Sequence, residues 1–134
     1  MTIFSNVGNQ AVLPCSWKSE LNDINNPICH IQWQTPASTV FEQRGAQRWE
    51  ASEFKGRVEM PEDQLDQGDC SLTLKDVQHY DVGLYESYVV VDGARMKQRI
   101  YIQSVRLLVH GKYMLYRAAD LFNRIFGFHI QGLN

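Results

Sequence analysis

The side chains of this 134-residue chain best suited to chemistry are its three cysteines and four histidines. Cys15, Cys29 and Cys70 show no C-x-x-C spacing, and the histidines lie far apart in the sequence. Structural zinc sites need such ligands in closely spaced groups, so the sequence indicates no metal site. In an oxidising compartment, an odd number of cysteines predicts one disulfide and one free thiol.

Serine is the other possible nucleophile, but Ser16, Ser71 and Ser87 have no histidine at a motif spacing. The chain also lacks a glycine-rich phosphate loop. The acidic loop expected over 61–69 lacks the glycine and ligand pattern of a calcium site, and carboxylates grouped in this way are typical of a solvated surface. We therefore expect no enzyme and no cofactor.

Composition places the chain among single globular domains. Hydrophobic residues make up 44% of the chain, charged residues 21%, and the formal net charge is −2. Basic residues are scattered, which argues against nucleic acid as a partner. No apolar run is long enough to span a bilayer, so we expect no membrane insertion by this chain. Residues 1–5 lack the pattern of a signal peptide, so an extracellular protein would be represented here by its mature part.

Alternation of apolar and polar residues indicates an all-β protein. The segment 47–54 is expected to be irregular or a short edge strand, and 92–93 is a hairpin turn signal. The last strand changes parity along its length, which predicts a bulge near 103–104. The strands expected from these patterns cover 11–17, 28–34, 39–44, 70–74, 85–91 and 95–109, and the family resemblance described next implies a further strand over 54–60.

The segment 81–87 reads Asp-Val-Gly-Leu-Tyr-Glu-Ser and resembles the D-x-G-x-Y-x-C motif of immunoglobulin V-type domains, with Ser87 in place of the cysteine. The resemblance covers about residues 3–110 and implies a two-sheet antiparallel V-type sandwich over 1–110. Residues 40–58 look most like those of butyrophilins and related costimulatory ligands. The residues that carry the structural motif are Cys15, Trp33, Arg57, Asp81, Gly83 and Tyr85.

The resemblance implies a role for each of these residues. Trp33 is expected to fill the core, Arg57 to pair with Asp81, and the Tyr85 hydroxyl to bond back to the backbone as a tyrosine corner. Gly83 is expected to allow a close backbone approach.

Ser87 cannot form the disulfide that V-type domains make with the cysteine at position 15. In the topology implied by the resemblance, Cys29 and Cys70 begin strands of opposite sheets and both point inward. We therefore expect a Cys29–Cys70 disulfide, with Cys15 a buried free thiol. Two alternatives remain open at this stage: a Cys15–Cys70 disulfide between neighbouring strands, and three reduced cysteines in a cytosolic domain.

The tail, residues 111–134, changes to helical spacing. Over 113–126 the apolar residues fall on one side and the polar residues on the other, which predicts a short amphipathic helix. Its apolar side could pack on the same sandwich, a second copy, a membrane interface or a neighbouring domain. The apolar positions are Met114, Leu115, Ala118, Leu121, Phe122, Ile125 and Phe126.

V-type domains usually bind partners through the face of one sheet, here the sheet containing strands 28–34, 39–44, 85–91 and 95–109. Aromatic residues and arginine among uncharged residues are typical of interface centres. The function expected from the resemblance is protein recognition in immune regulation or adhesion, by an extracellular domain that is cell-surface or secreted. The partner would be a cell-surface receptor or ligand, and the alternative is a homodimer formed through the tail helix or the sheet face. The expected partner-binding residues are Gln32, Gln34, Phe41, Arg44, Tyr88, Val90 and Tyr101.

Overall fold

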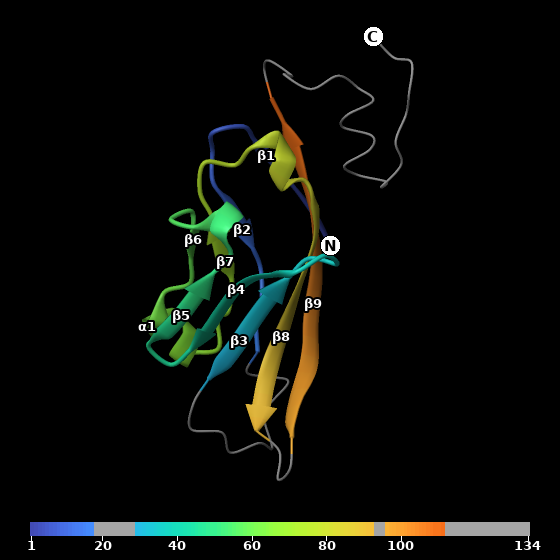
Figure 1. Cartoon of the computed structure of the whole chain (residues 1–134). Helices are drawn as coiled ribbons and strands as arrows, with labels where there is room; N and C mark the ends of the chain where they lie inside the picture. Colours follow the sequence, from blue (N-terminus) through green and yellow to red (C-terminus); the bar gives the residue numbers. More distant parts are fainter. Residues whose placement is uncertain (18–28, 93–95, 112–134) are drawn as a thin grey trace.

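The computed structural model describes residues 1–17, 29–92 and 96–111, and Figure 1 shows how their elements are arranged. The first five strands precede a short 3-10 helix, η2. A second set of elements, which includes the α-helix α1 and the 3-10 helix η3, leads to the two longest strands. In chain order the elements are β1 (Thr2–Asn6), β2 (Ala11–Leu13), β3 (His30–Gln34), β4 (Thr39–Arg44), β5 (Gln47–Glu50), η2 (Ser52–Phe54), β6 (Val58–Glu59), α1 (Glu62–Asp66), β7 (Leu72–Leu74), η3 (His79–Asp81), β8 (Gly83–Asp92) and β9 (Lys97–His110).

Within the described residues, the strands form two sheets. One sheet has six strands in the order β1-β9-β8-β3-β4-β5, and the other has three strands in the order β2-β7-β6. Neighbours pair antiparallel except β1, which runs parallel to β9. The predicted all-β, two-sheet sandwich is confirmed.

The segment 47–50 forms the edge strand β5, one of the two forms expected for it. The acidic loop differs from the expectation, because it contains the short helix α1 with Leu65 buried beneath it. Pro61, the residue directly before α1, has an extended backbone conformation. The amphipathic helix predicted for 113–126 lies outside the described residues.

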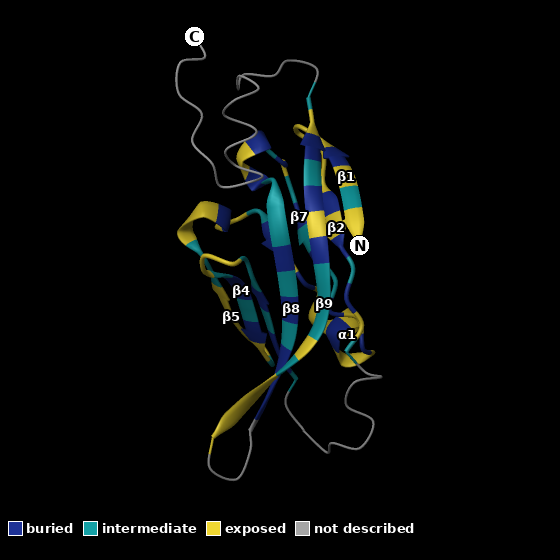
Figure 2. Cartoon of the chain, turned by 90° about the vertical axis from the view of Figure 1, so that its right-hand side faces the viewer, coloured by how far each residue is buried: buried dark blue, intermediate teal, exposed yellow. Residues whose placement is uncertain are grey.

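The core lies between the two sheets and is centred on Trp33, whose side chain is fully buried. Burial alternates along β3 and β7, because successive side chains of a strand point to opposite faces. Figure 2 shows the alternation along β8 and β9 as bands of colour. The indole Nε1 of Trp33 donates a hydrogen bond to the Cys70 carbonyl at 3.0 Å, which links the larger sheet to the smaller one through a buried polar contact.

Two bulges decide which side chains face outward. In the β8–β9 pair, Ser87 lies opposite Gln103 while Tyr88 lies opposite Tyr101, so Ile102 is the extra residue. The bulge predicted near 103–104 is therefore present, one position earlier. In the β3–β4 pair, Trp33 lies opposite Phe41 while the next residue pairs with Thr39, which makes Val40 the extra residue.

The predicted Cys29–Cys70 disulfide is wrong: the bond joins Cys15 to Cys70, and Cys29 is the free cysteine. Leu13 pairs with Leu72, and continuing this register places Cys15 directly opposite Cys70. The Cys70 N–H donates to the Cys15 carbonyl at 3.0 Å, and the two Cα atoms are 4.9 Å apart, well within the range of a disulfide. The expectation failed because alternation gives the face of a residue but not its cross-strand partner.

The corner between β7 and β8 has the ion pair that the motif implies. Arg57 Nη1 and Nη2 donate to the two Asp81 carboxylate oxygens at 2.8 and 3.0 Å. The Tyr85 hydroxyl donates to the Asp81 carbonyl at 2.5 Å, which forms the expected tyrosine corner. Hydrogen bonding to Asp81 raises the pKa of Arg57, and burial raises the pKa of Tyr85, so both groups keep their protons.

The close approach expected at Gly83 is absent. A Cβ atom added there would have nothing within 4 Å, so no neighbour requires a glycine at this position. Gly83 instead lines a groove beside the corner.

Candidate recognition face

The outward face of the six-stranded sheet has one row of paired side chains that crosses five strands. Each member lies directly opposite the next, and opposite residues of paired strands share a face. The row begins at the edge strand β5 and ends on β9. We call it the recognition row, and its residues are Trp49, Glu42, Gln32, Tyr88 and Tyr101.

The end of the row on β8 and β9 is an ordered group of aromatic rings beside one guanidinium. The Arg99 guanidinium carbon lies 4.0 Å from the centroid of the Tyr88 ring, within cation–π range. Arg99 Nη2 also donates to Gln34 Oε1 at 2.5 Å. The Tyr88 and Tyr101 rings meet edge to face with centroids 5.9 Å apart, and the Tyr101 hydroxyl bonds Ser104 Oγ at 2.7 Å. These contacts hold the rings in place before any partner binds.

Both ends of the recognition row are open to solvent. Trp49 is 52% exposed and Tyr101 is 50% exposed. Next to Trp49, His30 Nε2 and Glu42 Oε1 form a hydrogen bond of 2.5 Å. A shallow cavity of about 290 Å³ lies here, lined by His30, Glu42 and Trp49 among others. The row thus combines large aromatic groups with polar neighbours.

Five of the residues expected to bind a partner do lie on this face. Gln32, Tyr88 and Tyr101 belong to the recognition row, Gln34 bonds Arg99 beside it, and Arg44 is exposed opposite His30.

Phe41 does not lie on the face, and its predicted exposure is wrong. Its ring is fully buried (0% exposed), because it shares the inward face with Trp33, its cross-strand partner. The Arg48 guanidinium carbon lies 5.2 Å from the ring centroid. Phe41 also differs in parity from Arg44, three residues later on the same strand, so the two side chains point to opposite faces of the sheet.

Val90 is also buried, at 6% exposure, although it is not part of the main core cluster. Its cross-strand partner is Arg99, whose much longer side chain extends further from the sheet than a valine can. Alternation along the strand correctly predicted which face Val90 lies on, but it could not show that a longer neighbouring side chain would cover this residue.

Sequence reasoning missed Trp49 and Arg99 as members of this face. Arg99 precedes Tyr101 by two residues on one strand, so their shared parity was a usable signal. Trp49 could be placed only once 47–50 was known to be a strand paired with β4.

A two-sheet sandwich with a tyrosine corner, a buried core tryptophan and an Arg57–Asp81 bridge defines the immunoglobulin-type class. Residues 2–110 match the immunoglobulin V-set domain family, and the chain belongs to that family. Immunoglobulin V-set domains form a non-enzymatic family, which confirms the expectation that the chain is not an enzyme.

The chain is similar to mouse butyrophilin-like protein 1, with 34% identity over 85 residues. That match covers 59% of this chain and 16% of the relative, so the chain spans about a sixth of the relative's length. This match confirms the expected resemblance to butyrophilins.

Solved structures share the fold. The human B7-H4 IgV-like domain superposes with a TM-score of 0.62 at 24% identity, covering 83% of this chain and 93% of that one. A chain from the crystal structure of ICOS in complex with ICOS-L and an anti-ICOS-L VNAR domain gives a TM-score of 0.62 at 20% identity, covering 81% and 53%.

Within the described residues, no helix is both long and apolar enough to cross a bilayer. Among the same residues, no group of three or more histidine, cysteine or acidic side chains is arranged to hold a metal ion.

Proposed function

We propose that this chain is an extracellular recognition domain, cell-surface or secreted, that binds another protein through the recognition row. Its role would be in immune regulation or adhesion, and its partner a cell-surface receptor or ligand. The observation that carries the proposal is the Arg99–Tyr88–Tyr101 group at the β8–β9 end of the row.

The chemistry of this group suits a binding site better than a purely structural one. Tyrosine, tryptophan and arginine are the residue types most enriched at binding hot spots. The aromatic rings are fixed by contacts with one another and with Arg99, so little side-chain freedom remains to be lost on binding. Trp49 and Tyr101, at the two ends of the row, are both about half exposed and therefore accessible to a partner.

The relatives and the disulfide support the extracellular part of the proposal. V-set domains of butyrophilin-like and costimulatory proteins typically lie outside the cell. The Cys15–Cys70 bond fits an oxidising compartment, where structural disulfides form and persist. One of the solved structures that share the fold is a chain from a complex of ICOS with ICOS-L.

The proposal can be tested by probing an array of cell-surface ectodomains with a tetramer of the full chain. We expect Tyr88→Ala and Arg99→Ala each to weaken binding to the partner by tenfold or more, the usual scale of hot-spot truncation. Val12→Ala is the matched control, because Val12 is an exposed apolar residue on the smaller sheet. Binding that persists unchanged in both row variants would contradict the proposal.

A further inference from the structure

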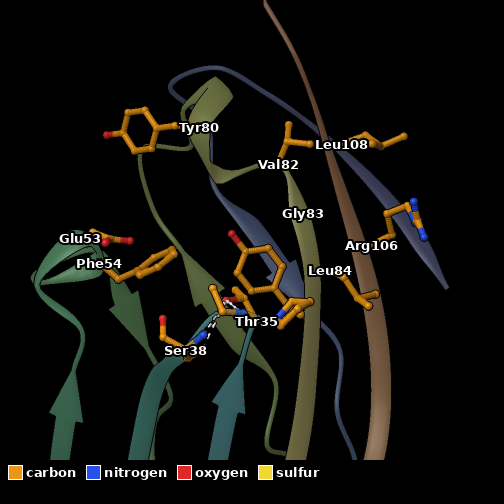
Figure 3. A pocket seen from close by; sticks show the side chains of 13 residues that line it. Thr35, Ser38, Glu53, Phe54, Tyr80, Val82, Gly83, Leu84, Arg106 and Leu108 are labelled. Carbon is orange, nitrogen blue, oxygen red and sulfur yellow. Dashed lines mark hydrogen bonds between the residues drawn. The ribbon is translucent and has the colours of Figure 1, made fainter. Parts of the chain in front are cut away.

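A groove of about 800 Å³ lies at the end of the sandwich where β8 begins (Figure 1). In the view of Figure 3, Phe54 and Tyr80 line one side, and Leu84, Arg106 and Leu108 line the other. The absence of a side chain at Gly83 leaves space between them. A pocket of this size takes several side chains.

The groove continues into an apolar surface on the outer face of the larger sheet. Leu108 on β9 pairs with Phe4 on β1, and paired residues share a face. Phe4 is 74% exposed and Tyr80 is 49% exposed, so large apolar groups remain uncovered by the described residues. An apolar surface of this kind at the mouth of a groove indicates that something covers it.

The chain leaves the described structure next to this groove. Gly111 follows β9, only three residues after Leu108, and is tightly packed. A Cβ at this position would lie 2.7 Å from His79 Nε2 and 2.9 Å from Val7 Cγ2. His79 directly precedes Tyr80, which lines the groove, so the exit point of the chain is fixed at the groove's edge.

We propose that residues 113–126 of the same chain dock as an amphipathic helix in this groove, with their apolar side against Leu84, Leu108 and Tyr80. The segment begins two residues after the fixed Gly111, which places it within immediate reach. As a helix its 14 residues would be about 21 Å long, at 1.5 Å per residue. Seven apolar positions on one side match the groove in chemistry, and Arg117 and Arg124 on the other side can remain in solvent.

The docking differs from the recognition function and does not depend on it. The groove lies near Leu84 and Leu108, whereas the recognition row crosses the strands at Tyr88 and Tyr101. A docked tail would cover the groove and leave the row open to a partner.

A photoreactive residue, p-benzoylphenylalanine, placed at position 84 of the full chain tests the docking directly. We expect irradiation to join position 84 to a peptide within 113–126, in a product with the mass of one chain. The same residue at position 12, on the smaller sheet, is the control and should give no such product. A product with the mass of two chains would assign the groove to a second copy and overturn the proposal, as would the absence of a link to the tail.

Hydrogen exchange on the full chain gives an independent readout. We expect the amides of 113–126 to be protected at least tenfold, and Leu108→Glu to remove that protection. Leu108 is half-buried at the groove, and an unchanged exchange rate in β3 would verify that this variant is folded. Val12→Glu should leave the tail protected. Unprotected tail amides in the unmodified chain, or protection that survives Leu108→Glu, would overturn the proposal.

Discussion

The two sheets of this sandwich differ in what joins the strands within each of them. The smaller sheet has a covalent bond between adjacent strands, Cys15–Cys70, in addition to its hydrogen bonds. The larger sheet has no disulfide among its described strands, and it provides the outward face with the recognition row.

This difference leaves the contact between the sheets without a disulfide among the described residues. Ser87, where V-type domains have a cysteine, is fully buried and donates its hydroxyl to the Gln103 carbonyl within its own sheet. The sheets are therefore joined by apolar packing, by the Trp33 indole on the Cys70 carbonyl and by the Arg57–Asp81 corner. The following predictions test how much each of these connections contributes.

Removing the disulfide should have the largest effect on stability. The bond closes a loop with a sequence separation of 55 residues, and Cys15→Ala combined with Cys70→Ala should lower the free energy of unfolding by about 4 kcal/mol in the chain-entropy account. Chemical denaturation without reductant measures the change. Cys29→Ala, which removes the free thiol, should change it by less than about 1 kcal/mol. A Cys29 variant as destabilised as the double variant would refute the assignment.

Breaking the corner ion pair should come next. Arg57→Ala leaves Asp81 buried without its cationic partner, at a cost of about 3 kcal/mol in the free energy of unfolding. Lys75→Ala is the matched control, because it removes an ion pair with Glu59 in which both side chains are exposed, and it should cost about 1 kcal/mol at most. Equal losses in the two variants would show that the corner does not connect the sheets as described.

The buried indole should make a smaller contribution. Trp33→Phe keeps an aromatic ring in the core but removes the hydrogen bond to the Cys70 carbonyl, which we expect to cost about 1–3 kcal/mol. Trp49→Phe, the same change at an exposed position on the recognition row, should leave the free energy of unfolding nearly unchanged. Comparable destabilisation by both variants would contradict the assigned role of Trp33.

The smallest predicted effect concerns the free thiol. Burial and the nearby charge of Asp66 raise the pKa of Cys29 to about 12, so the thiol stays protonated as the pH rises from 7 to 9. Alkylation by iodoacetamide should be at least about tenfold slower in the folded chain than in the unfolded chain, because only the thiolate reacts. Asp66→Asn should speed the folded reaction modestly, by about twofold. A folded rate that increases with pH as steeply as the unfolded rate would contradict the raised pKa.

Sequence reasoning succeeded where a property depends on one strand at a time. The strands, the core tryptophan, the corner residues and the outward face of Tyr88 and Tyr101 all follow from alternation or from the resemblance. The errors concern relations between strands. The partner of Cys70 depends on the register of Leu13 with Leu72, and the burial of Phe41 depends on its pairing with the inward Trp33.

The remaining errors have a similar origin. Val90 lies on the predicted face but is buried beside a longer side chain, and Gly83 has no close neighbour despite its place in the motif. Both properties depend on the side chains that pack around a residue. The spacing of residues in one sequence does not show which side chains these are.

The location of the disulfide is the central claim, and one peptide map tests it. Trypsin, which cleaves after lysine and arginine, separates the cysteines into peptides 1–18, 19–44 and 58–75. After alkylation of the folded and then the denatured chain without reductant, we expect 1–18 to be joined to 58–75 and Cys29 to be alkylated. Finding 19–44 joined to 58–75 would contradict the account.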